Sequence, residues 1–181
     1  MATKTKRDYD LLQIDAETLT ATRAVWLKQI DNDPKLAHRP DIEGKLDWVE
    51  KHLEYTKGPE FAYGVFDKGA GHADAIVDVV YQKDAGKKWL KAMGVTLAPK
   101  ENRFFGEGPQ DFENMVEIYS AAIFGVLKLT KVHQTKVTKL YGRSATLLAF
   151  LEAMAATLKT RGGLKNVSVK MESRWLVFTA Q

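Results

Sequence analysis

The chain has 181 residues, 45% of them hydrophobic and 28% charged, with a net charge of +4, which is typical of one globular domain. It contains no cysteine, so a disulfide framework and a thiolate metal site are excluded. No stretch reaches the roughly 18 uninterrupted apolar residues that a membrane span needs, and the first residues are polar and basic. We therefore expect a cytoplasmic protein with no membrane partner, folded as a single domain over residues 1–181.

The first unit that the sequence predicts spans residues 9–82 and begins with a strand at 9–14. Asp15 has the side-chain type that favours an N-cap, and apolar residues then recur at helical spacing to about Ile30. Asp41 is expected to cap a second helix of the same kind. The unit therefore opens with one strand and two amphipathic helices.

A β-hairpin follows, in which residues 61–67 and 72–82 flank a short glycine-bearing loop. Alternation along the second strand places His72, Asp74 and Asp78 on one face, where they could ligate a hard metal or position a base. However, His72 and Asp78 would be about 20 Å apart at roughly 3.3 Å per residue, too far to share one ion. We interpret this face as solvent-exposed and predict no metal site.

Residues 83–134 are interpreted as a helical insertion. Residues 87–93 resemble a short helix, and Gly106 and Gly108 indicate a break after it. A 3.6-residue apolar period then predicts a buried-face helix over residues 111–129, although a strand interpretation of its second half also alternates. This apolar helix would suit packing between subunits, so a homo-oligomeric scaffold is one of the functions left open.

The last unit, residues 135–180, is the most regular. It predicts a strand at 136–141, a helix that Ser144 caps, and two further strands at 167–171 and 175–179. Strand, helix and strand in this order imply a right-handed parallel crossover. The expected fold class is therefore mixed α/β (α+β), with a mainly antiparallel sheet and one parallel crossover.

The strand-to-helix junction at residues 139–144 is the best candidate binding site. A helix amino terminus presents unpaired N–H groups and a partial positive charge. Gly142 would let an anion approach the backbone, Lys139 and Arg143 add positive charge, and the Ser144 hydroxyl could donate to a bound oxygen, as in a phosphate cradle. A structural role fits the same residues, with Gly142 relaxing the turn and Ser144 capping the helix. The sequence leaves both interpretations open.

The spacing Lys139-x-x-Gly142-x-Ser144 resembles the pyrophosphate loop of the GNAT acyltransferases, which usually reads Arg or Gln, two residues, Gly, one residue, then Gly or Ala. The predicted order is also similar to the GNAT fold: strand, two helices, β-hairpin, another strand, the loop, a helix and a further strand. The resemblance implies a GNAT-like fold with an insertion and transfer of an acyl group to the amine of a small-molecule acceptor. It implies that acetyl-CoA or another acyl-CoA binds at Lys139, Tyr141, Gly142, Arg143 and Ser144.

The charge distribution supports an alternative function. Nine basic residues stand between Lys128 and Lys170 against one acidic residue, Glu152, so the remainder of the chain is net acidic. Such a segment could contact phosphates without reading sequence, as in a non-catalytic nucleic-acid-binding or assembly protein of a phage or mobile element. A solvated lysine-rich surface also explains the pattern and is the favoured interpretation of the charge alone.

Catalytic residues cannot be assigned from the sequence. Glu172 could act as a general base, but a turn residue paired with Arg174 is the favoured interpretation. Serine catalysis has no support, because the Gly-x-Ser-x-Gly elbow is absent. The four tryptophans lie in apolar patterns and are expected in the core: Trp26, Trp48, Trp89 and Trp175.

Overall fold

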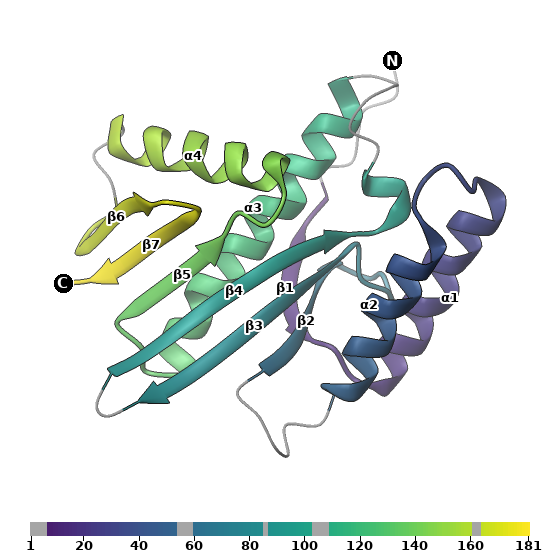
Figure 1. The fold of residues 1–181 in the computed structure, drawn as a ribbon, viewed down its shortest axis with the longest axis horizontal. Helices are drawn as coiled ribbons and strands as arrows, with labels where there is room; N and C mark the ends of the chain where they lie inside the picture. The colour runs from purple at the N-terminus through teal and green to yellow at the C-terminus, as the bar shows by residue number, and fades with distance from the viewer. Residues whose placement is uncertain (1–6, 54–59, 85–86, 103–108, 161–163) are drawn as a thin grey trace.

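The computed structural model describes residues 7–53, 60–84, 87–102, 109–160 and 164–181. Within them, seven strands form one mixed sheet in the order β1-β2-β3-β4-β5-β7-β6 (Figure 1). The strands are β1 (Tyr9–Gln13), β2 (Glu60–Asp67), β3 (Ala75–Asp84), β4 (Lys87–Leu97), β5 (Val137–Tyr141), β6 (Val167–Glu172) and β7 (Trp175–Ala180). The helices are α1 (Ala16–Asn32), α2 (Arg39–Lys51), the 3-10 helix η1 (Pro99–Asn102), α3 (Pro109–Val132) and α4 (Ala145–Thr160). The predicted mixed α/β class is confirmed.

Helices α3 and α4 cover one face of the sheet and build the larger core. Ile118 and Ile123 of α3 and Leu151 of α4 are fully buried against strand residues that include Leu90 and Leu140. Removing these apolar side chains from water stabilises the layer by about 25 cal/mol per Å². This face therefore joins β2, β3, β4, β5 and β7 into one hydrophobic layer.

Helices α1 and α2 cover the opposite face, where they pack against β2 and β3. Trp26 of α1 and Leu46 of α2 are fully buried with Phe66 of β2 and Ile76 of β3. The indole Nε1 of Trp26 donates a hydrogen bond to the carbonyl oxygen of Ala73 at 2.8 Å, so its one polar atom is satisfied. This contact fixes α1 over the start of β3.

The predicted cap of the first helix is confirmed, and that of the second is wrong. Asp15 accepts a hydrogen bond from the amide of Thr18 at 2.8 Å, and the Thr18 hydroxyl accepts one from the amide of Asp15 at 3.0 Å, which is a capping box. Helix α2 instead begins after His38, whose side chain makes no cap hydrogen bond. Pro40 stands in its first turn, where a missing N–H costs nothing, and Asp41 follows it inside the helix.

The helix predicted at residues 87–93 is wrong, because these residues belong to β4 in the middle of the sheet. Residues 83–134 therefore supply β4, η1 and α3 to the common layers rather than a helical insertion. The helix predicted at 111–129 is confirmed as part of α3. The break predicted at Gly106 and Gly108 lies outside the described residues.

A β-bulge explains why β4 does not look like a strand in the sequence. Asp78 of β3 pairs with Gly94, whereas the next residue, Val79, pairs with Ala92. Met93 is therefore the extra residue of the bulge and has no partner in β3. Because one added residue reverses the inward and outward positions, the period of two is lost across β4.

Over the residues that the structure describes, the sheet contains one parallel pair of hydrogen-bonded neighbours. Strands β4 and β5 are parallel and joined through α3, whereas every other neighbouring pair of the described sheet is antiparallel. The predicted parallel crossover through α4 is confirmed, because β5 and β6 are both antiparallel to β7 and so run parallel to each other. β7 lies between them in the sheet. Among the described residues, no helix is long and apolar enough to cross a membrane.

Candidate functional site

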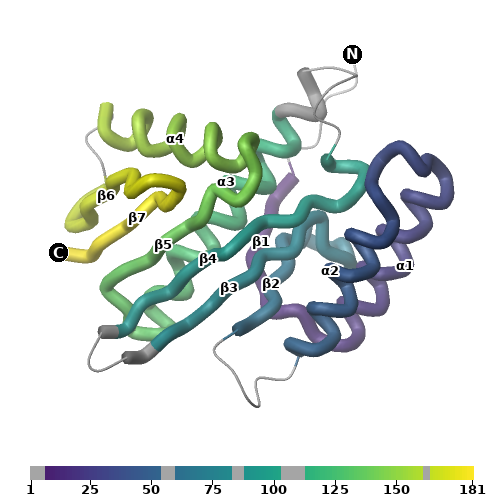
Figure 2. Tube along the Cα trace, in the orientation of Figure 1, coloured from purple at the N-terminus to yellow at the C-terminus, as the bar shows by residue number. Residues whose placement is uncertain are grey.

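Strands β4 and β5 separate in the middle of the sheet. Their pairing runs from Trp89 opposite Val137 to Ala92 opposite Leu140 and ends there, although β4 continues to Leu97. In Figures 1 and 2 the two strands run together at one end and diverge toward the other. Within the described residues, the last four residues of β4 therefore have a strand partner only on the β3 side, and Met93 has none. Their backbone groups on the other edge remain available for hydrogen bonds.

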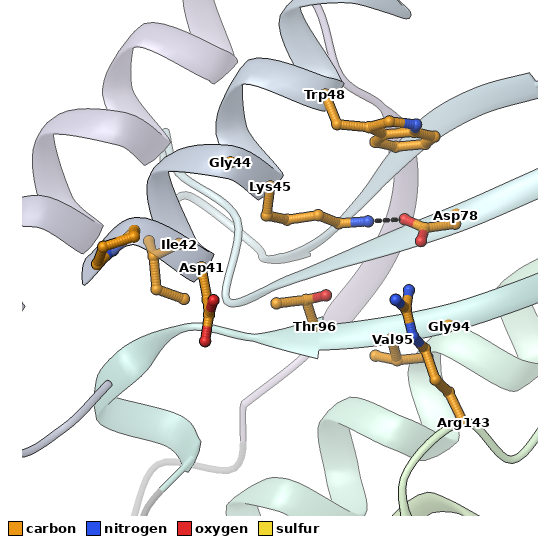
Figure 3. A pocket seen from close by; sticks show the side chains of 11 residues that line it. Asp41, Ile42, Gly44, Lys45, Trp48, Asp78, Gly94, Val95, Thr96 and Arg143 are labelled. Carbon is orange, nitrogen blue, oxygen red and sulfur yellow. Dashed lines mark hydrogen bonds and ion pairs between the residues drawn. The ribbon is translucent and has the colours of Figure 1, made fainter. Parts of the chain in front are cut away.

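A pocket of about 580 Å³ lies beside this opening, between α2 and the strands β3 and β4 (Figure 3). This volume falls within the range of small-molecule sites, about 300–1,000 Å³. The side chains that matter for its chemistry come from four separate parts of the chain, namely Lys45, Trp48, Asp78, Thr96 and Arg143.

Lys45 and Asp78 form an ion pair in the wall of this pocket (Figure 3). Each side chain is only 12% exposed, so the pair is largely removed from water. Burial lowers the pKa of the Lys45 ammonium, and the carboxylate of Asp78 opposes that effect. The Lys45 ammonium also lies 4.2 Å from the ring centroid of Trp48. Asp78 is thus an acidic side chain held in place at the floor of a pocket.

Arg143 reaches the same pocket from the residues that precede α4. A Cβ atom at Gly94 would lie 3.6 Å from Cδ of Arg143 and 3.7 Å from Oδ2 of Asp78. The absence of a side chain at Gly94 therefore leaves space at the point where the two charged groups approach β4 (Figure 3).

No protein-family model and no curated protein matches this chain. Among solved structures, a GNAT-family acetyltransferase from Staphylococcus aureus Mu50 superposes with a TM-score of 0.50 at 7% identity, over 94% of this chain and 98% of that one. The chain has the GNAT fold. An aminoglycoside N(6′)-acetyltransferase from Legionella pneumophila has a TM-score of 0.43 at 10% identity, covering 97% of this chain and 93% of its own. A GNAT-family acetyltransferase from Brucella melitensis in complex with acetyl-CoA has a TM-score of 0.42 at 13% identity, covering 96% of this chain and 89% of its own.

A second segment of the sequence matches the GNAT pyrophosphate-loop pattern. In the order given above, the loop follows the strand after the hairpin, and that strand is β4. Residues 103–108, between η1 and α3, read Arg-Phe-Phe-Gly-Glu-Gly and match the GNAT pattern at every specified position. They lie outside the described residues, so the match is one of sequence. The sequence alone did not point to this segment, because the strand that precedes it was predicted as a helix.

At the predicted junction, the contacts of Gly142 favour the structural role. Its amide donates to the carbonyl oxygen of Arg174 at 2.8 Å, and its own carbonyl oxygen accepts from Nε of Arg174 at 2.9 Å. A Cβ atom at Gly142 would lie 2.8 Å from the Cα of Leu148, so α4 packs directly on this glycine. The Ser144 hydroxyl accepts a hydrogen bond from the amide of Leu147 at 3.0 Å, as an N-cap does.

The other residues of the predicted site are engaged in separate contacts. Lys139 forms an ion pair with Glu172 at 3.3 Å, and the Tyr141 ring lies 4.8 Å from that of Trp175. Of the five predicted residues, only Arg143 lines the pocket.

The predicted pairing of Glu172 with Arg174 is wrong. Hydrogen bonds from Lys170 and Lys139 hold the pKa of Glu172 below its usual range, and Arg174 instead holds the turn before α4.

The prediction of a solvent-exposed face is wrong for Asp74 and Asp78, whereas the His72 side chain is 31% exposed. Asp74 is 8% exposed and Asp78 is 9% exposed, because α1 and α2 cover this face of β3. Burial raises the pKa of Asp74, while the Arg7 guanidinium at 3.6 Å opposes that shift. Among the described residues, no group of three or more potential ligands could hold a metal.

The tryptophans divide into two groups. Trp26 is fully buried, which confirms the core prediction for that residue. Trp48, Trp89 and Trp175 are half-buried, so the same prediction is wrong for them. The Lys91 ammonium lies 3.7 Å from the Trp89 ring centroid, which keeps a charge over this half-buried indole.

Proposed function

We propose that this protein is an acyltransferase that binds an acyl-CoA and transfers its acyl group to an amine. The observation that carries the proposal is the free edge of β4 beside the Asp78 pocket in a GNAT fold. One edge of β4 offers backbone hydrogen bonds to an extended ligand, and the pocket offers a second molecule a carboxylate. The same opening would bring both reactants to Gly94.

The acyl-CoA would bind along the edge of β4 that β5 leaves free, since its amide groups can pair with an open strand edge as a peptide does. Its pyrophosphate would bind at residues 103–108, whose sequence matches the GNAT pattern and leads into α3. This assignment replaces Gly142, where the backbone amide already has a partner. Arg103 would supply a guanidinium for the charge of the pyrophosphate.

Asp78 is the proposed general base. Its Oδ1 accepts from Lys45, while Oδ2 lies toward Gly94 and is placed to accept a proton from an amine. The amine nitrogen would add to the thioester carbonyl carbon to give a tetrahedral oxyanion, which collapses to the amide as the carbon–sulfur bond breaks. The amine proton passes to Asp78, and the departing thiolate takes one proton from solvent. Backbone N–H groups beside the bulge at Met93 would stabilise the oxyanion.

Acetyl-CoA binding provides the test. At about 100 times its dissociation constant, a ligand stabilises the folded state by about 2.7 kcal/mol, which raises the Tm of a chain of this size by roughly 5–10 °C. We expect this shift in the wild-type protein and its loss in Gly106→Val, because a branched side chain would block approach to the backbone. Gly71→Val is the matched control, since a Cβ at Gly71 meets nothing within 4 Å. A wild-type Tm that no acyl-CoA changes would contradict the proposal.

A further inference from the structure

The inner part of the pocket holds two positive side chains and one carboxylate. Asp78 is paired with Lys45 through Oδ1, so this pair carries no net charge. Arg143 adds a guanidinium, and its positive charge contributes to lowering the pKa of Lys45 after the larger effect of burial. The charges near Gly94 therefore sum to an excess of one positive charge.

No carboxylate among the described residues neutralises Arg143, which forms no ion pair there. Asp41 also lines the pocket, but its side chain is 80% exposed and lies 3.3 Å from His38. In Figure 3 the guanidinium of Arg143 points toward Asp78 rather than away from the cavity. Arg143 is thus a free bidentate donor at a partly enclosed site, which suits a carboxylate.

We infer that the acceptor of the acyl group is an amino acid-type molecule, which carries a free carboxylate close to its amine. This inference rests on the proposed function. The amine would bind Oδ2 of Asp78, and the carboxylate would bind the neighbouring guanidinium of Arg143, since both side chains approach Gly94. The apolar surfaces of Ile42 and Trp48 would take the remaining side chain of the acceptor. Polycationic amines would be poor acceptors, because Lys45 and Arg143 repel them.

The experiment compares matched acceptors. Release of CoA from acetyl-CoA is measured with each common amino acid, with the corresponding amino acid amide, and with spermidine as a polycation. We expect at least a tenfold preference in kcat/KM for the best amino acid over its amide, since only the acid can bind Arg143 by two hydrogen bonds. Arg143→Gln should remove this preference while the amide is still turned over. Arg23→Gln, which removes a guanidinium paired with Asp47 and Glu50 outside the pocket, should retain it.

Any other result contradicts the acceptor assignment. Calorimetry with acetyl-CoA then shows whether that assignment fails alone or together with the proposed function. If the protein binds acetyl-CoA but turns over acid and amide equally, or uses no member of the panel, the acceptor assignment fails alone. The same holds if Arg143→Gln keeps the preference. If Arg143→Gln instead weakens acetyl-CoA binding tenfold, Arg143 serves the acyl-CoA, as the sequence predicted. Absence of acetyl-CoA binding to the wild type removes both proposals.

Discussion

Asp78→Asn should lower kcat for acyl transfer by about 10²- to 10⁴-fold, the usual contribution of a general base. An amide cannot take the amine proton at neutral pH, whereas its shape still fills the position between Lys45 and Gly94. Acetyl-CoA affinity should stay unchanged, because the proposed binding edge belongs to β4. The measurement is the rate of CoA release with the best acceptor, together with acetyl-CoA calorimetry.

Stability must be followed in the same variant. The substitution leaves the buried Lys45 ammonium without its counter-ion, and breaking one partner of a buried pair costs about 3–5 kcal/mol. Rates are therefore compared well below the Tm of the variant. Glu50→Gln is the control, since this α2 carboxylate is 65% exposed and outside the pocket. A kcat for Asp78→Asn within threefold of the wild type would remove Asp78 from the mechanism.

Gly142→Ala should destabilise the protein by about 1–3 kcal/mol, as overpacking of a close contact does. The new methyl carbon would lie 2.8 Å from the Cα of Leu148, which is backbone and moves only with the first turns of α4. Urea unfolding measures this loss. Gly44→Ala is the matched control. A Cβ at Gly44 in α2 would meet nothing within 4 Å, so this substitution should raise the free energy of unfolding by up to about 1 kcal/mol through helix propensity.

The same variant separates the two interpretations of the junction. If Gly142 has only a packing role, acetyl-CoA affinity should persist in the folded fraction of Gly142→Ala. A variant of unchanged stability that no longer binds acetyl-CoA would instead place the pyrophosphate at Gly142. That result would support the pyrophosphate site that the sequence predicted at residues 139–144.

Local signals in the sequence predicted most elements correctly. The hairpin was recognisable from two alternating runs around glycines, and α1 from Asp15 with apolar residues at helical spacing, because both patterns depend on neighbours in the chain. β4 was missed because the extra residue Met93 breaks the alternation. Because β4 was not predicted as a strand, the GNAT pattern at residues 103–108 did not follow a predicted strand and was not recognised.

The pocket could not be predicted, since its groups meet only through tertiary packing. Asp78 looked exposed from strand alternation alone, and only the placement of α2 over β3 buries it. Lys45, Asp78 and Arg143 are separated by tens of residues and share no motif. The nucleic-acid-binding alternative stays a prediction. Two of its lysines, Lys139 and Lys170, pair with Glu172, which reduces the charge they can offer.

Hydrogen exchange along β4 tests most directly whether an acyl-CoA binds where the two strands part. With saturating acetyl-CoA, the peptide covering residues 93–97 should exchange at least tenfold more slowly, because the ligand would occupy the edge that β5 leaves open. Residues 139–144 should exchange at an unchanged rate. Unchanged exchange at 93–97 in protein that binds acetyl-CoA would contradict this account.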